Sequence, residues 1–175
     1  MNFLQKTMAG LMIASSSVLP VEANEHFRDH YNLALAVESV GVDFQLNPPA
    51  CYYKVNHNTY GWYWAEQNQL VVCQINATDT NEVPWTREDL DTLRHEVHHL
   101  VQDCMDDELN GHLHAVYEDP HRLAVDWLGH DMIRLIRHGY ADQSSHLQLM
   151  ELEAFSVAKM DDPQEQLRDI MNYCM

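Results

Sequence analysis

The sequence has few cationic side chains. Ten Lys and Arg residues stand against 27 Asp and Glu residues, so the formal net charge at pH 7 is −17. A charge of this sign repels the phosphate backbone of nucleic acids and the anionic surface of membranes. We therefore expect no nucleic-acid partner and no membrane binding through a basic surface.

Long apolar runs, internal repeats and linkers are also missing. A spanning helix needs roughly 20 apolar residues. The best candidate, from Met8 to about Leu19, is shorter than this and is interrupted by three serines. We expect no stable membrane span. Without repeats or a linker, the 175 residues fit a single domain.

The first 23 residues have the pattern of an export signal. Lys6 precedes the apolar run, and Val21-Glu22-Ala23 has the small-x-small form of a cleavage site before Asn24. The pattern predicts a signal peptide over 1–23 and a secreted or periplasmic domain over 24–175. The alternative is an apolar arm that is retained and contacts a partner in an assembly such as a virion.

No CxxC motif is present, which argues against a structural zinc knuckle. Four cysteines allow three disulfide pairings. In an exported protein we expect the pairs Cys51 with Cys73 and Cys104 with Cys174. In a reducing cytoplasm they would instead be small buried core residues.

The hydrophobic pattern predicts an α+β fold. Helical spacing is clear over 25–40 and again from residue 86 onward. Between them, residues 50–75 are rich in Tyr, Trp and Val, with turn residues at 56–58 and 66–68, which predicts a short antiparallel sheet. Helices of the second half are expected from the cap at Thr86, from 119–120 to about 139, over 144–160, and from 162–163 onward.

The helix expected after Thr86 contains an HExxH motif. His95 and His99 are four residues apart and face the same side of a helix, where two imidazoles can take adjacent corners of a zinc site. Glu96 is placed to act as the general base that takes a proton from water. His98 points away from this face and is not expected to be a ligand.

The two faces of this helix differ in character. Thr92, His99 and Gln102 lie within about 60° of His95 at 100° per residue. The opposite side is apolar and consists of Leu90, Leu93, Val97, Leu100, Val101 and Cys104. A metal site on one face and the core on the other is the arrangement expected for the floor of a cleft. The alternative is a solvated histidine face.

A catalytic zinc needs a third protein ligand and one open position. The extended pattern HExxHxxGxxH is absent, because Gln102 and Met105 occupy the Gly and His places. Glu151, in an apolar helix with small neighbours, is the expected third ligand. Glu153 lies about 200° away on that helix and is an alternative. The remaining candidates are three histidines of a loop, His112, His114 and His121.

Together the two motifs resemble the gluzincin group of zincin metallopeptidases. His95, Glu96 and His99 match the HExxH motif, and Glu151-Leu152-Glu153-Ala154 matches the ExEA motif of the second helix. The stretch around the HExxH motif is also similar to small proteins associated with marine cyanobacteria and their phages. The resemblance implies a zincin-like fold, a bound Zn²⁺ and hydrolysis of a peptide or protein substrate.

The sequence departs from the larger gluzincins at one place. Phe155 stands where those relatives have an aspartate that supports a ligand, and Asp103 or Glu153 is a candidate to replace it. Tyr140 or Tyr117 is a candidate to stabilise the oxyanion. The alternative function is that of a structural or interaction protein in an assembly, which keeps the zinc-binding fold.

The zincin-like fold also suggests where substrate is held. In that fold a strand beside the cleft pairs with extended substrate, and residues 69–74 precede the motif helix in the expected order. Their alternation fits an ordinary core strand equally well.

Overall fold

The computed structural model describes residues 25–53, 59–106 and 109–175. The predicted signal peptide or arm over 1–23 and the predicted turn at 56–58 lie outside these residues. Within the described part, no helix is long and apolar enough to cross a membrane.

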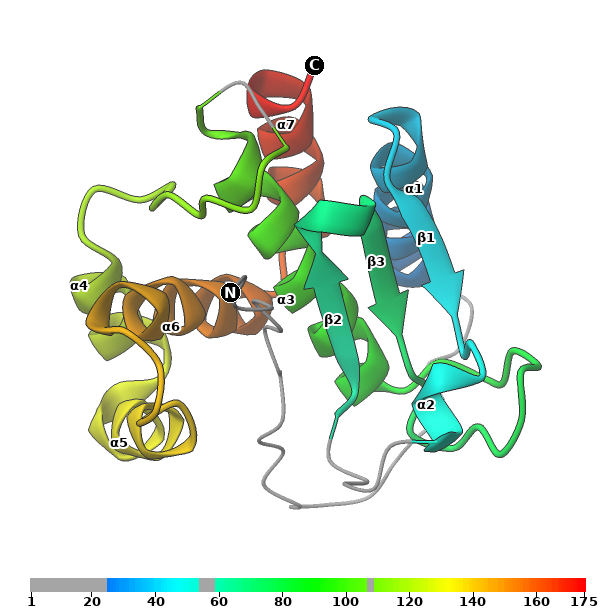
Figure 1. Cartoon of the computed structure of the whole chain (residues 1–175), viewed down its shortest axis with the longest axis horizontal. Coiled ribbons are helices and arrows are strands. Elements are labelled where there is room, and N and C mark those ends of the chain that lie inside the picture. Colours follow the sequence, from blue (N-terminus) through cyan, green and yellow to red (C-terminus); the bar gives the residue numbers. More distant parts are fainter. Residues whose placement is uncertain (1–24, 54–58, 107–108) are drawn as a thin grey trace.

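Helix α3 lies at the centre of an α+β fold, between a small sheet and a group of helices (Figure 1). The sheet and α1 pack on one side of α3, and α6 packs on the other, with α4 and α5 beyond it. The α+β prediction is confirmed. The elements are α1 Glu25–Ser39, β1 Asp43–Leu46, α2 Ala50–Tyr53, β2 Gly61–Trp64, η1 Ala65–Gln67, β3 Gln69–Val72, α3 Arg87–Cys104, α4 Pro120–Trp127, α5 Gly129–Gly139, α6 Ser145–Met160 and α7 Pro163–Tyr173.

The three strands form a mixed sheet in the order β1-β3-β2. Strands β2 and β3 are antiparallel, as the sequence predicts, and Tyr63 lies opposite Leu70. Strand β1 is parallel to β3, with Phe44 opposite Leu70, and it lies outside the predicted meander. The start of that meander, Ala50–Tyr53, is instead a short helix. A purely antiparallel sheet is therefore corrected to a mixed one.

The central position of β3 changes the expected role of residues 69–74. Because β3 pairs with β1 on one side and β2 on the other, its backbone groups are already used within the sheet. Leu70, Val71 and Val72 are also fully buried. The prediction that this strand pairs with substrate is therefore wrong. Among the described strands, β2 is the edge strand that packs on α3.

Side-chain caps begin the helices where the sequence predicts them. The Thr86 hydroxyl accepts from the Asp89 amide at 3.2 Å, and the Asp89 carboxylate accepts from the Thr86 amide at 2.8 Å, which completes a capping box for α3. Ser144 and Asp162 cap α6 and α7 in the same region of the chain as predicted. The helix expected over 119–139 is divided at Gly129, whose φ of 75° is left-handed.

The largest apolar cluster joins the sheet, α1 and α7 to α3. Each Leu or Val buried there contributes roughly 1.5–3 kcal/mol relative to an exposed position. Both predicted disulfides, Cys51 with Cys73 and Cys104 with Cys174, are present, and the second one belongs to this cluster. The second pair ties the last residue of α3 to the residue that follows α7.

Candidate metal centre

Three side chains from two helices converge at the interface of α3 and α6. His95 and His99 come from α3 and Glu151 from α6, and one potential ligand atom of each lies within 4.8 Å of the others. The two Nε2 atoms are 3.1 Å apart. Glu151 Oε2 is 3.3 Å from His95 Nε2, and Oε1 is 3.5 Å from His99 Nε2. The structure therefore brings together the three residues that the motifs predict as ligands.

The donor set fits a metal ion. Two imidazole nitrogens and a carboxylate are ligands of zinc and of other divalent transition metals. All three side chains are at most 2% exposed, and Glu151 Oε2 has no hydrogen-bond partner among the described residues. Burying such groups is costly unless a partner or a metal satisfies them. A cation between these atoms would remove that cost.

The charges within the cluster are unevenly distributed. Burial lowers the pKa of His95, so this imidazole is neutral. Burial also acts against a charged His99, but the attraction of the Glu151 carboxylate outweighs it and raises the pKa of His99. Burial alone would raise the pKa of Glu151, yet the charge on His99 and the imidazole nitrogens that lie 3.3 and 3.5 Å from its oxygens lower it. Without a metal, His99 therefore carries the proton that balances Glu151.

Close packing of α6 on α3 places Glu151 at the cluster. Ala154 and Ala158 are buried on α6, and their small side chains permit a close approach. Arg94, on α3 and 1% exposed, donates through Nε to the carbonyl oxygen of Ala158 at 2.9 Å. Its Nη1 also lies 2.7 Å from Asp161 Oδ1, just beyond α6. This buried guanidinium fixes the end of α6 against the turn of α3 that carries His95.

Glu96 is fully buried beside the cluster, beneath strand β2. Its charge adds to the effect of Glu151 in raising the pKa of His99. A Cβ atom at Gly61 of β2 would lie 3.1 Å from Glu96 Cγ and 2.7 Å from Thr92 Cγ2. The absence of a side chain at Gly61 therefore allows the β2 backbone to pass directly over the general base predicted from the motif.

Glu153 does not belong to the cluster. Its Oε1 lies 2.8 Å from His98 Nε2, on the side of α3 predicted to carry no ligand. Among the described residues, the three histidines named as further candidates are not part of the His–His–Glu group: His112, His114 and His121 are exposed. His121 was expected in a loop and lies instead in the first turn of α4. The structure thus separates Glu151 from its alternatives.

Gln102 is the residue near the cluster that sequence reasoning left without a role. His99 Nδ1 lies 2.8 Å from Gln102 Oε1, and the Gln102 amide nitrogen donates to Glu153 Oε1 at 3.1 Å. Asp103, in contrast, accepts from the Tyr63 hydroxyl and from a neighbouring loop, away from the cluster. The sequence did contain a signal for the role of Gln102, since this residue is polar and falls on the ligand face of the helical wheel.

Different aromatic residues lie beside His95 and His98. Phe155 packs against His95 with ring centroids 4.3 Å apart, and Tyr140 lies behind Phe155 at 6.5 Å. Tyr117 lies beside His98 at 6.2 Å. The oxyanion role of either tyrosine stays a prediction.

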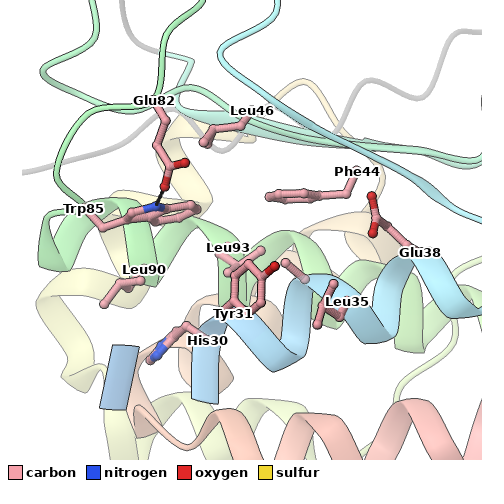
Figure 2. A pocket seen from close by; sticks show the side chains of 11 residues that line it. His30, Tyr31, Leu35, Glu38, Phe44, Leu46, Glu82, Trp85, Leu90 and Leu93 are labelled. Atoms are coloured by element: carbon pink, nitrogen blue, oxygen red, sulfur yellow. Dashed lines mark hydrogen bonds between the residues drawn. The ribbon is translucent and has the colours of Figure 1, made fainter. Parts of the chain in front are cut away.

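An apolar pocket of about 200 Å³ lies on the opposite face of α3 (Figure 2). Figure 2 shows Phe44 of β1 facing Tyr31 of α1 across it, with Trp85 at one end donating to Glu82 at 2.7 Å. Leu90 and Leu93 of the apolar face of α3 also line the pocket. The pocket and the His–His–Glu cluster are therefore separate places, divided by α3 itself.

Comparisons with known proteins identify no family. No protein-family model matches the chain, and no curated protein or solved structure gives a significant match. The functional conclusion therefore depends on the residues and geometry described above.

Proposed function

We propose that this protein is a zinc-dependent metallopeptidase of the gluzincin type, with a zincin-like domain over 24–175. His95, His99 and Glu151 hold the zinc ion, and Glu96 is the general base. The observation that supports this most directly is the convergence of the HExxH histidines with a glutamate from a second helix, beside a buried Glu96. One potential ligand atom of each of the three residues lies within 4.8 Å of the others.

Each residue has a definite chemical task. Zinc, when bound, stabilises the developing charge on the scissile carbonyl and makes water a stronger acid. Glu96 takes the proton of the attacking water and then delivers it to the leaving amine. The buried surroundings of Glu96 strengthen this electrostatic effect, because little water screens it.

The edge of β2 is suited to holding an extended peptide. The Cys73 amide donates to the Tyr60 carbonyl, so Tyr60, Trp62 and Trp64 use their backbone groups toward β3. The N–H and C=O groups of Gly61 then point toward the outer edge, where a substrate strand can pair. Gly61 lies directly over Glu96, so that edge supports binding of the scissile bond near the general base.

The two disulfides are typical of an oxidising compartment. Together with the signal-peptide pattern over 1–23, they support a secreted or periplasmic location for the peptidase. A peptide or protein outside the cytoplasm is then the expected substrate.

Metal analysis and peptide hydrolysis, measured on the wild type and on Glu96→Gln, test this function. The variant removes the base but keeps the ligands, so it should bind zinc as the wild type does. Its hydrolysis rate should fall by roughly 10²–10⁴-fold. Wild-type protein that binds no zinc after supplementation would end the proposal.

A structural role in an assembly is the second candidate. The observation that favours it is the burial of the cluster, where all three ligands are at most 2% exposed. In that case zinc would hold α3 and α6 together, and a partner would contact the segment 1–23. The wild type would then bind zinc and lose stability when the metal is chelated, yet hydrolyse no peptide. Two observations favour the enzyme. The described residues offer three protein ligands, which leaves one position of a zinc ion open, and Glu96 lies beside them.

A further inference from the structure

A chain of hydrogen bonds runs from the candidate ligand His99 into the protein. His99 Nδ1 and Gln102 Oε1 are 2.8 Å apart. The Gln102 side-chain nitrogen contacts two oxygens, the Met150 carbonyl and Glu153 Oε1, each at 3.1 Å. Gln102 is fully buried, so water does not compete for these contacts.

The chemistry of these groups fixes the direction of each bond. A backbone carbonyl accepts and never donates, so the atom of Gln102 that faces Met150 must be the NH₂ group. The amide oxygen therefore faces His99, and it can only accept. His99 must then carry a hydrogen on Nδ1. The lone pair that remains for a metal is on Nε2, the atom that faces His95 and Glu151.

Glu153 holds Gln102 in this orientation. Its Oε1 also lies 2.8 Å from His98 Nε2 and accepts from the amide of Val116 at 2.9 Å. Its Oε2 accepts from the amide of Tyr117 at 3.3 Å. A carboxylate bound from three other directions cannot rotate freely, so it offers Gln102 a fixed acceptor. Glu153 is itself fully buried.

His95 has no equivalent support. Its Nδ1 has no hydrogen-bond partner among the described residues, and its ring is held by contact with Phe155. The two histidines are thus oriented by different means: packing for His95, and directional hydrogen bonds for His99.

We propose that Gln102 is a positioning residue that selects the Nε2-binding form of His99, and that Glu153 acts through Gln102. This inference rests on the proposed metal site. In the larger gluzincins an aspartate supports a metal ligand, and Phe155 stands at that position here. The proposal assigns the same task to Gln102 of α3 and to Glu153 of α6. Residues behind metal ligands raise metal affinity by holding the ligand ring and its tautomer.

To test this role, we would measure the zinc affinity of the full-length Gln102→Met variant by competition with a chelator of known affinity. Methionine keeps the volume and removes all three side-chain hydrogen bonds of Gln102, so zinc affinity should fall by roughly 10- to 100-fold. Gln166→Met is the matched control. Gln166 of α7 is as buried as Gln102, and it donates to the backbone carbonyl of Arg94 on α3 at 2.6 Å. Its hydrogen bonds to the described residues include none to a candidate ligand. This control should keep wild-type zinc affinity.

A second measurement requires no variant to fold. Long-range ¹H–¹⁵N NMR spectra of the zinc-loaded wild type should show the His99 proton on Nδ1, protected from exchange with water. A wild-type zinc affinity in folded Gln102→Met, or a His99 proton absent from Nδ1, would overturn the inference. A wild type that binds no zinc would instead overturn the proposed function itself, so the two failures are distinguishable.

Discussion

The two buried faces of α3 are held by different forces. Toward the sheet and α1, Leu93, Val97 and Leu100 lose their contact with water and pack into the largest apolar cluster. Toward α6, the buried side chains include His95 and His99, and both lie beside the Glu151 carboxylate. Apolar burial is non-directional and tolerates repacking, whereas buried polar groups must meet specific partners.

Stability of the fold is enough to explain the apolar face of α3, but not the polar face toward α6. An apolar residue in place of Glu151 would satisfy the α3–α6 interface without the cost of burying a carboxylate, because buried ion pairs seldom improve on good hydrophobic packing. The polar face is therefore poorly explained by stability and well explained by a ligand. Substitutions on the two faces should affect different measurements.

Removing Glu151 should have the largest effect on metal binding. Glu151→Ala takes away one of three protein ligands, so zinc affinity should fall by more than the roughly 100-fold typical of residues behind the ligands. Competition with a chelator measures this loss. Glu38→Ala, an exposed acidic residue on α1, controls for the change in net charge and should bind zinc normally. If Glu151→Ala binds zinc as the wild type does, the third ligand is another residue.

Removing Leu93 should act on stability instead. Leu93 is 1% exposed on the apolar face, so Leu93→Ala should lower the free energy of unfolding by about 2–5 kcal/mol. Denaturant unfolding of the metal-free protein measures it. The folded variant should keep wild-type zinc affinity, because the substituted side chain lies on the far side of α3. A large loss of affinity would show that the two faces are not independent.

The smallest effect expected is a dependence of zinc affinity on pH. In the metal-free protein the pKa of His99 is raised by Glu151, whereas the pKa of Glu151 is lowered and that of His95 is lowered by burial. At neutral pH, His99 therefore holds the one ligand proton that zinc must displace. Affinity should rise about tenfold per pH unit below the pKa of His99. Calorimetry in buffers of different ionisation enthalpy should show release of about one proton; release of none would mean that His99 is already neutral.

The helical half of the fold could be predicted because its signals are local. The capping box at Thr86 and the caps at Ser144 and Asp162 are read from a few neighbouring residues, and the structure confirms them. Strand β1 was missed because Asp43–Leu46 is only four residues long. Its partner, β3, is more than 20 residues away, and a parallel pairing leaves no hairpin turn in the sequence.

The missed strand also explains the wrong role given to residues 69–74. With β1 unseen, β3 was free to be an edge strand, whereas in the structure it is central. Helical periodicity, in contrast, separated Glu151 from Glu153 and placed His98 off the ligand face. Helical periodicity could not assign a role to Gln102, because its amide nitrogen bonds to the carbonyl of Met150, which is 48 residues away on another helix.

The pairing of the cysteines has a consequence for the order in which the protein matures. Cys51 and Cys73 are 22 residues apart, and Cys104 and Cys174 are 70 residues apart. A chain that enters an oxidising compartment from its N-terminus presents the first pair before either member of the second. Once Cys51 and Cys73 have reacted, the three possible pairings reduce to one, since only two thiols are left. For a chain exported in this way, sequential entry would favour the native pairing, and the disulfide that closes the 70-residue loop would form second.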